Sequence, residues 1–584
     1  MQTCVKTMLC VLALCFAPLA DATVHDQLFR GSFDIPADQP ASTAAAARFL
    51  TQATFGPTQG DVAYLMAQGY GEWIAEQLAK PATLGEPTIE AIANARTTGG
   101  QSVTNTIRLN RFFWQAVYAP DQLRQRMAYE LSQIFVVSDQ ASDIGNNYMV
   151  PLSQYQDMLA KSAFLPYAQL LLNVTDHPMM GRYLNAFRNV KATFVGGVQT
   201  TSPDENYARE VMQLFSIGLI MRNPDFSPVI QNGTTVPTYD QNVITQTAKV
   251  FTGFTWSDAP TNPPTFNGGG LTFAAQYAPM ACWGTELFPA SSNQMRHDIS
   301  VKTVLGDGGA STTSSIAANQ TCAQDVTDEL AIIATHPNVA PFISRQLIQR
   351  FVESNPSSAY IARITIVFNT PGNDLGDVIA AILTDPEAEN PPPLCGSANC
   401  DSYGKLREPV LRLTELWRAF NAQAPAPDQY GQIAMIGGGG FLGSFGQAPL
   451  ESPTVFNFYL PDYQQPGVFA DNGLYSPELQ ITNESTTYST ADTYYGFTAK
   501  AYQGMASPPT DRPLIDLSSL TANANNPAAM VTTLDADLFY GGMSAAMQST
   551  LTGMLTNLSG ASAQEKAWSA IYVAMLSPEF ATQR

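Results

Sequence analysis

Apolar residues recur every three or four positions along most of the chain, which is the spacing that places them on one face of an α-helix. Residues 102–118 and 120–137 show this pattern clearly and predict two successive amphipathic helices. Strict alternation, typical of a half-buried strand, is rare. The pattern predicts further helices over 148–161, 166–173, 178–184, 204–217, 241–252, 325–335, 339–353, 359–368, 375–384 and 405–422, and three or four more after residue 514.

Two stretches interrupt the helical pattern. Residues 256–319 are rich in Pro, Gly, Asn, Thr and Ser, and residues 437–490 begin with consecutive glycines and contain many Pro and Tyr. Irregular segments of this length are usually functional or flexible. Alternation over 266–275 predicts one short hairpin. The expected fold class is therefore mainly α: a large multi-helix unit with two long irregular loop regions and at most a short β-hairpin.

The first segment predicts export. Lys6 precedes an apolar run over 8–17, and the small-residue pattern Ala20-Asp21-Ala22 follows it, as in a signal peptide cleaved after Ala22. The run is too short to cross a bilayer, which takes about 20 residues. We expect a signal peptide over 1–22, an N-terminal extension over 23–43 and a single large helical domain over 44–584. A sub-boundary is possible near 386–404. The expected mature protein is secreted or periplasmic, without a transmembrane span.

The charge content of the chain limits the classes of partner that it can bind. Charged residues make up only 13% of the chain, and the formal net charge is −20. Phosphate binding needs clustered Lys and Arg, so this balance argues against nucleic acid and against an anionic membrane surface. The apolar fraction of 45% is enough for a sizeable core and excludes an ordinary disordered chain.

Cysteine usage predicts disulfides. Three of the seven cysteines lie in the expected signal peptide, which leaves Cys282, Cys322, Cys395 and Cys400. An even number in an oxidising compartment suggests two disulfides, with three possible connectivities. The simplest is the local pairing 282–322 and 395–400. A four-thiolate metal site is the rival interpretation, but it usually has C-x-x-C pairs and none is present.

The densest polar cluster lies in the predicted helix over 204–217. At helical spacing, Glu205 and Arg209 share one stripe, with Asn206 and Glu210 beside it. The functional interpretation is a polar face that lines a cleft, with carboxylates as acid, base or cation ligands and Arg209 as an anion clamp. The structural alternative is an S-x-x-E capping box from Ser202 to Glu205, followed by an i,i+4 ion pair between Glu205 and Arg209.

Histidine is scarce, and one histidine stands apart. His177 and His336 each precede Pro at predicted helix junctions, which favours capping or packing roles. His297 lies in the first irregular region, where the adjacent Asp298 is expected to orient it and Lys302 brings a cation nearby. A catalytic or ligand role for His297 and Asp298 is therefore the second candidate.

Other motifs give weaker signals. G-x-S-x-G, a Walker loop and H-E-x-x-H are all absent, and the glycines at 438, 440 and 443 lack a βαβ context. No cofactor or metal is therefore assigned. The second irregular region carries many tyrosines, which either stack on sugars or bind proteins, or simply pack the loops; the group is Tyr459, Tyr463, Tyr475, Tyr488, Tyr494 and Tyr495.

An ordered series of segments resembles the bacterial family catalogued as domain of unknown function 1800. The most specific segment is Glu205-Asn206-Tyr207-Ala208-Arg209-Glu210. The other matching segments lie at 48–58, 122–127, 251–256, 297–302, 405–410, 452–458 and 576–580, so the resemblance spans about residues 44–584.

The resemblance implies a secreted or periplasmic, mainly helical bacterial protein with no established activity, so no catalytic role carries over. Such proteins are often encoded beside a sulfatase-like family, which implies a sulfatase-like partner protein. Some members carry a histidine after the R-x-R-M element, whereas this chain has none over 128–135.

Three functional hypotheses follow. The first is a secreted protein that acts with a partner in envelope or extracellular polymer processing, polysaccharide included. The second is a hydrolase-like enzyme whose cleft joins Glu205, Asn206, Arg209 and Glu210 to His297 and Asp298. The third is a structural or surface-binding module that uses the Tyr-rich loops.

Overall fold

The computed structural model describes residues 39–392, 402–437, 441–498 and 509–584. In these ranges the chain is mainly helical, with five two-stranded antiparallel sheets, so the predicted mainly α class is confirmed. The predicted signal peptide over 1–22 and the pair Cys395 and Cys400 lie outside the described residues. Among the described helices, none combines the length and apolar character needed to cross a membrane.

The elements follow one another in three groups. The first group is α2 (Thr43–Ala53), α3 (Gln59–Gln68), α4 (Tyr70–Ala79), α5 (Glu86–Thr98), α6 (Asn105–Tyr118), α7 (Gln122–Ser132), η1 (Gly145–Tyr148), α8 (Met149–Ser162), α9 (Tyr167–Asp176) and α10 (Pro178–Tyr183). The second group carries most of the strands: β1 (Thr193–Val195), β2 (Val198–Thr201), α11 (Asn206–Gln213), β3 (Ile230–Gln231), β4 (Thr234–Thr235), α12 (Gln241–Val250), β5 (Phe254–Thr255), α13 (Phe273–Tyr277), β6 (Ala281–Cys282), β7 (Lys302–Leu305), β8 (Thr313–Ile316), α14 (Cys322–Ala334), α15 (Val339–Phe351), α16 (Ser358–Asn369), α17 (Leu375–Leu383) and α18 (Pro386–Glu389). The third group is β9 (Lys405–Leu406), α19 (Pro409–Ala419), α20 (Leu442–Phe445), α21 (Val468–Asp471), η2 (Pro477–Ile481), α22 (Glu484–Thr498), α23 (Ser518–Thr521), α24 (Pro527–Leu534), η3 (Asp535–Phe539), α25 (Ala545–Asn557), α26 (Ala563–Met575), α27 (Pro578–Ala581) and β10 (Thr582–Gln583).

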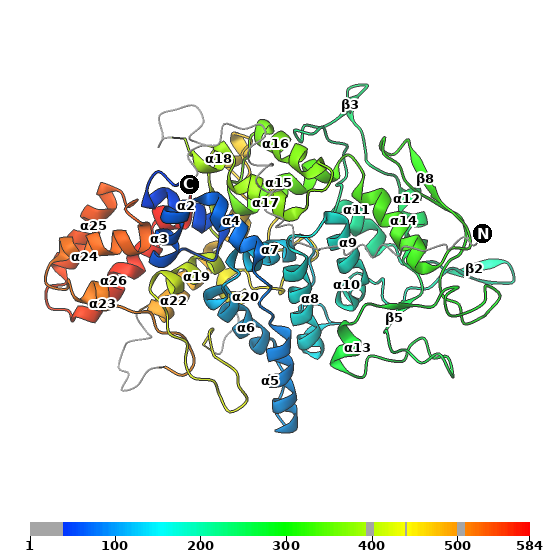
Figure 1. Cartoon of the computed structure of the whole chain (residues 1–584), viewed down its shortest axis with the longest axis horizontal. Coiled ribbons are helices and arrows are strands. Elements are labelled where there is room, and N and C mark those ends of the chain that lie inside the picture. The colour runs from blue at the N-terminus through cyan, green and yellow to red at the C-terminus, as the bar shows by residue number, and fades with distance from the viewer. Residues whose placement is uncertain (1–38, 393–401, 438–440, 499–508) are drawn as a thin grey trace, which may run out of the picture.

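Two large hydrophobic clusters support this arrangement. The first cluster is built from α2 to α4, α7 to α12 and α14 to α17. The second is built from α6, α19, α20, α22 and the helices that follow α22. In Figure 1 the C-terminal helices α23 to α26 form one end of the molecule, α11, α12 and α14 lie toward the other, and α7 and α15 lie between them. The centre of the molecule is therefore where both clusters meet.

Helical periodicity located most helices to within a few residues. The helix predicted over 148–161 is α8 (Met149–Ser162), and the helix predicted over 339–353 is α15 (Val339–Phe351). Both contribute buried apolar residues to the first cluster, which is the property that the spacing detects.

Three sequence predictions were wrong. The helix α7 has the predicted apolar stripe but lacks a solvent-facing polar side, because every residue in it except Arg124 is buried. Residues 266–275 form no hairpin; a short helix, α13, begins at Phe273 instead. The helix predicted from residue 405 begins at Pro409, because Lys405 and Leu406 form the strand β9, which pairs with the C-terminal strand β10. The described residues also hold more short hairpins than the one that was expected.

A buried carboxylate caps α5 from a different helix. The N-cap residue of α5, Gly85, has no side chain to accept the free amides of the first turn. The Asp157 carboxylate on α8 accepts hydrogen bonds from the Gly85 amide at 2.8 and 3.0 Å and from the Glu86 amide at 2.9 Å. Asp157 therefore ties α5, which projects from the body in Figure 1, to the first cluster.

We expect the substitution Asp157→Ala to lower the free energy of unfolding by about 1–3 kcal/mol, because it leaves buried amides without an acceptor. Urea unfolding measures this loss. Asp157→Asn, which keeps one acceptor oxygen, should lose less. An Asp157→Ala protein as stable as the unsubstituted chain would show that α5 is capped in another way.

Candidate functional site

The helix that carries the densest polar motif starts later than the sequence suggested. The described helix α11 begins at Asn206, with Glu205 as its N-cap and no hydrogen bond from the Glu205 side chain to the first turn. The predicted capping box from Ser202 is therefore wrong. Instead, the Asp204 carboxylate accepts a hydrogen bond from the Asn206 amide at 2.8 Å, and Asn189 holds Asp204 in place by donating to its carbonyl and accepting from its amide.

The motif presents a half-exposed polar face that joins α11 to α12. Glu205 and Arg209 form the predicted ion pair at 3.4 Å, with side chains 32% and 38% exposed. Glu205 also accepts hydrogen bonds from Gln241 and Thr245, both at 2.8 Å. Capping therefore does not explain Glu205; its carboxylate links two helices at the surface.

Glu210 differs from its neighbours. It is buried, its Oε2 atom has no hydrogen-bond partner, and burial raises its pKa against the attraction of Arg209. A carboxyl group held toward its neutral form beside a half-exposed arginine has the character of a proton donor or acceptor. Asn206 lies at the start of the same helix and is half-buried.

His297 lies elsewhere and is completely buried. Its Nε2 atom lies 2.9 Å from Asp325 Oδ2, and its Nδ1 atom lies 2.9 Å from the carbonyl oxygen of Thr252. Lys302 Nζ lies 2.5 Å from the same Asp325 oxygen, so the expected nearby cation is present. The acid that orients His297 is Asp325, not the adjacent Asp298, whose carboxylate accepts hydrogen bonds from Ser300.

The composite cleft of the second hypothesis is not assembled by direct contact. Among the described residues, no hydrogen bond or ion pair joins His297 or Asp298 to Glu205, Arg209 or Glu210. The two groups have separate partners: the 205–210 face contacts α12, whereas His297 contacts Asp325 on α14 and the carbonyl of Thr252. They are therefore two candidate sites rather than one.

The other two described histidines hold helix junctions: His177 caps α10, and His336 lies between α14 and α15. His177 Nδ1 accepts a hydrogen bond from the Met179 amide at 3.1 Å, and His336 Nδ1 accepts one from the Asn338 amide at 3.2 Å. Burial lowers the pKa of His177 to about 3 and that of His336 to about 4, which keeps both rings neutral and able to accept.

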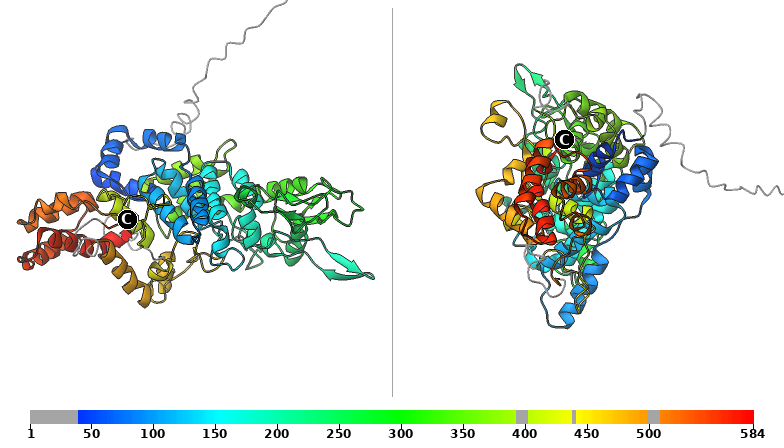
Figure 2. Two further views of the ribbon diagram at one scale, coloured as in Figure 1. Left: turned by 90° about the horizontal axis from the view of Figure 1, so that it is seen from below. Right: turned by 90° about the vertical axis from the view of Figure 1, so that its left-hand side faces the viewer.

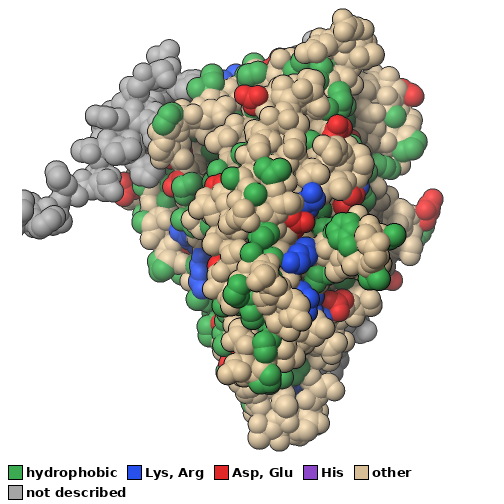
Figure 3. Space-filling model, turned by 90° about the vertical axis from the view of Figure 1, so that its right-hand side faces the viewer, with side chains coloured by type: hydrophobic (Ala, Val, Ile, Leu, Met, Phe, Trp, Pro, Cys, Tyr) green, Lys and Arg blue, Asp and Glu red, His purple; other side chains and the backbone are tan. Residues whose placement is uncertain are grey.

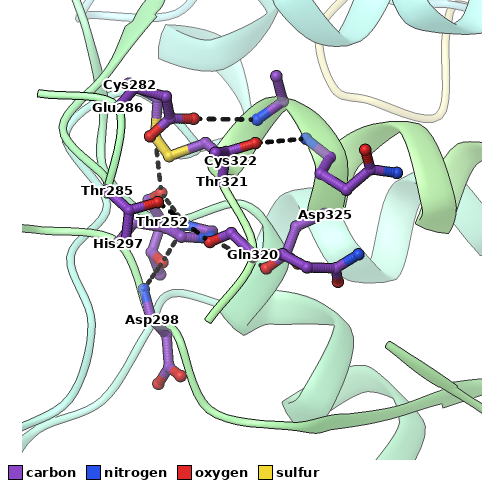
Figure 4. The surroundings of a disulfide bond; sticks show 12 residues. Thr252, Cys282, Thr285, Glu286, His297, Asp298, Gln320, Thr321, Cys322 and Asp325 are labelled. Atoms are coloured by element: carbon purple, nitrogen blue, oxygen red, sulfur yellow. Dashed lines mark hydrogen bonds and ion pairs between the residues drawn. A yellow bond between two sulfur atoms is a disulfide. The ribbon is translucent and has the colours of Figure 1, made fainter. Parts of the chain in front are cut away.

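The predicted disulfide between Cys282 and Cys322 is present beside His297 (Figure 4). The two sulfur atoms and a ring nitrogen of His297 lie within 4.8 Å of one another, which is a spacing that a metal ion can span. Sulfur atoms joined in a disulfide are not thiolate ligands, so this group is not a metal site in the oxidised protein.

A third polar group, which the sequence analysis missed as a unit, lies at the centre of the molecule. Glu408 Oε1 accepts hydrogen bonds from Gln133 at 3.0 Å, from Gln447 at 2.9 Å and from the Tyr459 hydroxyl. Around it lie two ion pairs, Arg126 with Glu130, and Lys405 with Glu478 at 3.0 Å. We call this set the central network; it also contains Arg350 and Asn457, which both donate to Gln133 at 3.0 Å.

The carboxyl groups of the central network have opposite electrostatic character. Burial raises the pKa of Glu130 to about 7, against the attraction of Arg126. Burial acts in the same direction on Glu408, but Lys405 and the hydrogen bond from Tyr459 outweigh it and hold its pKa below the usual value. Neighbouring carboxyl groups with pKa values shifted in opposite directions are common in acid–base sites. Here every member is at most 7% exposed, so the network binds the fold together rather than meeting a substrate.

The central network draws its members from several of the family-like segments. Arg126 comes from the 122–127 segment, Lys405 and Glu408 from 405–410, and Asn457 from 452–458. A partial signal was present in the sequence. In the segment 122–133, Leu123, Met127 and Leu131 form one narrow apolar stripe, while charged and amide residues occupy most of the remaining positions. Polar residues around so narrow a stripe are either exposed or buried among polar partners.

The tyrosines of the second irregular region do not form one surface. Tyr459 is buried in the central network, and Tyr494 is buried with its hydroxyl donating to the Pro409 carbonyl. Tyr475 packs under the guanidinium of Arg345. Only Tyr488, which is 77% exposed, stands clear among the large exposed side chains of this group. For Tyr459 and Tyr494 the loop-packing interpretation is therefore confirmed.

These features define a mainly helical protein with a buried ionic centre and a half-exposed E-N-x-A-R-E face. The chain belongs to the family described as protein of unknown function (DUF1800), whose model matches residues 48–582. No curated protein and no solved structure matches the chain. The family assignment confirms the resemblance and brings no activity with it.

We expect Glu408→Ala to lower the free energy of unfolding by about 3–5 kcal/mol, because it leaves Lys405 and the donors around Glu408 buried without their acceptor. Arg209→Ala, which breaks a half-exposed ion pair, should cost no more than about 1 kcal/mol. Chemical unfolding of both variants compares them directly. Equal losses would show that the central network does not hold the fold together.

Proposed function

We propose that this chain is a secreted bacterial protein that acts by binding a second protein, of the sulfatase-like type, in envelope or extracellular polymer processing. The observation that carries the proposal is the hairpin of β1 and β2. All seven residues of the two strands are exposed, and the turn is formed by Gly196 and Gly197, whose φ angles of 59° and 81° favour glycine.

The hairpin is apolar where it is most exposed. Phe194, Val195 and Val198 are 62%, 70% and 68% exposed. The hairpin projects from the end of the molecule opposite α24 to α26 (Figure 2). Figure 3 views that end and shows hydrophobic side chains scattered among other uncharged side chains and backbone, with several charged side chains between them. An apolar projection on such a surface is typical of an interaction site.

The chemistry of the hairpin favours a protein partner. The sheet has only two strands, so each strand keeps one edge that the sheet does not pair. Such an edge is a template for a strand of another protein. No charged residue occurs between Lys191 and Asp204, which leaves a polyanion nothing to bind. Asp204 leads directly into α11, so a partner on the hairpin lies close to the half-exposed Glu205 and Arg209.

We expect the triple substitution Phe194→Ser, Val195→Ser and Val198→Ser to weaken binding of a purified sulfatase-like protein from the same genome at least 10-fold. Burial of side chains of this size is worth about 1.5–3 kcal/mol each, and 1.4 kcal/mol corresponds to 10-fold. Calorimetric titration of the two purified proteins measures the dissociation constant.

The matched control is Leu271→Ser, which removes another apolar side chain that is 88% exposed. It should leave both binding and thermal stability unchanged. A triple variant that binds as tightly as the unsubstituted chain would refute the hairpin as the docking site.

A second candidate function is hydrolysis at the 205–210 face, which the unpartnered, buried Glu210 carboxyl favours. In this scheme Glu210 transfers the proton, Arg209 binds an anionic group of the substrate, and Glu205 and Asn206 position the face. If screening on esters and polysaccharides finds an activity, Glu210→Gln should reduce it by about 100-fold or more. The surface variant Glu484→Gln should not, and retention of activity by Glu210→Gln would remove Glu210 from the reaction.

A further inference from the structure

The Cys282–Cys322 disulfide is packed against ionisable groups rather than against apolar side chains alone. Cys322 is fully buried and is the first residue of α14, whereas Cys282, on β6, is half-buried. The disulfide thus joins a fully buried residue at a helix N-terminus to a residue that is only partly buried.

One stripe of α14 carries the inner groups. Cys322, Asp325 and Glu329 are spaced by three and four residues, face the same side of the helix and are all buried. Asp325 binds His297 and Lys302 through Oδ2, while its Oδ1 atom and the Oε2 atom of Glu329 have no hydrogen-bond partner. Burying this many ionisable groups is unfavourable. A disulfide whose only role is to link two segments does not need them.

Each ring nitrogen of His297 has an oxygen acceptor. Nε2 faces Asp325 and Nδ1 faces the Thr252 carbonyl, and both are oxygen acceptors at 2.9 Å. A histidine with two acceptors is satisfied as an imidazolium. A ring nitrogen of His297 lies within 4.8 Å of both sulfur atoms. The geometry thus puts a cation and a proton source beside the bond.

We propose that Cys282–Cys322 is a redox-active disulfide that exchanges with a dithiol substrate, with His297 as the proton donor to Cys322. This site is separate from the hairpin, and the proposal does not depend on partner binding there.

The reaction proceeds in two exchange steps. A substrate thiolate attacks Sγ of Cys282; the bond to Cys322 breaks, and its electron pair moves to Cys322 Sγ, which takes a proton from His297. The second thiolate of the substrate then attacks the substrate sulfur of the mixed disulfide and releases Cys282 as a thiolate. The substrate becomes a disulfide, and the two protons that it loses restore His297 and neutralise Cys282.

The charges around the sulfur atoms determine the equilibrium. The N-terminus of α14 and the His297 imidazolium stabilise the negative charge that develops on Cys322 Sγ before the proton is transferred. Glu286 accepts a hydrogen bond from the Ala323 amide at 3.3 Å, and its negative charge has the opposite effect on Cys322 Sγ. Lys302 and Asp325 form an ion pair behind the histidine, with Glu329 on the same stripe of α14 (Figure 4 shows Asp325, Glu286 and His297).

The test is the exchange equilibrium of the full mature chain with mixtures of reduced and oxidised glutathione. Acid quenching, alkylation in denaturant and mass spectrometry of the two cysteine peptides give the reduced fraction. We expect the native protein to be reduced reversibly without unfolding. His297→Gln should shift the exchange constant at least 10-fold toward the disulfide, which corresponds to about 30 mV for this two-electron couple.

Two further variants keep the test decisive. Glu286→Gln, at the surface, should shift the constant about 2- to 3-fold in the opposite direction, and it stands in for His297→Gln if that variant does not fold. His336→Gln alters a buried histidine that caps a different helix junction and should leave the constant unchanged. The proposal is overturned if neither His297→Gln nor Glu286→Gln moves the constant, or if the disulfide is reduced only when the chain unfolds.

Discussion

The structure depends on one electrostatic constraint: the Glu408 carboxylate is buried and can remain charged only when its partners are all in place. Those partners come from α7, from the segments around Gln447 and Tyr459, and from the strand β9 that carries Lys405. A buried ion without its partners costs several kcal/mol, so partial assembly of the centre is strongly unfavourable. The two hydrophobic clusters are thereby held in one relative arrangement, which non-directional apolar packing alone does not specify.

The chain places part of its few charged residues inside the molecule. Charged residues make up only 13% of the chain, and several are buried in pairs such as Arg126 with Glu130 and Arg407 with Glu415. At the end of the molecule seen in Figure 3, uncharged side chains and backbone make up most of the visible surface. The exposed apolar hairpin of β1 and β2 lies at that end.

The fold was predictable wherever helices have one apolar face, because burial on one side leaves a period in the sequence. At α7 the rule located the helix but not the surroundings of its polar residues, which are buried among polar groups far away in the sequence. The rule failed at Lys405, whose strand conformation is set by pairing with Thr582 and Gln583 at the other end of the chain. The candidate sites also divide into features that are local in the sequence and features that are not. The Glu205–Arg209 pair is local and was predicted, and so was the 282–322 disulfide. The orienting acid of His297 is Asp325, 28 positions away, and no local pattern distinguishes it from Asp298.

The pairing of β9 with β10 joins segments that lie far apart in the sequence. Gln583 donates hydrogen bonds to the carbonyls of Phe351 and Val352 at 2.6 and 2.8 Å, at the end of α15, beside the strand that carries Lys405. Contacts between residues so distant in the sequence cost more loop-closure entropy than the local contacts of a helix do. The structure around the end of α15 therefore depends on residues near position 583 as well as on its own helix.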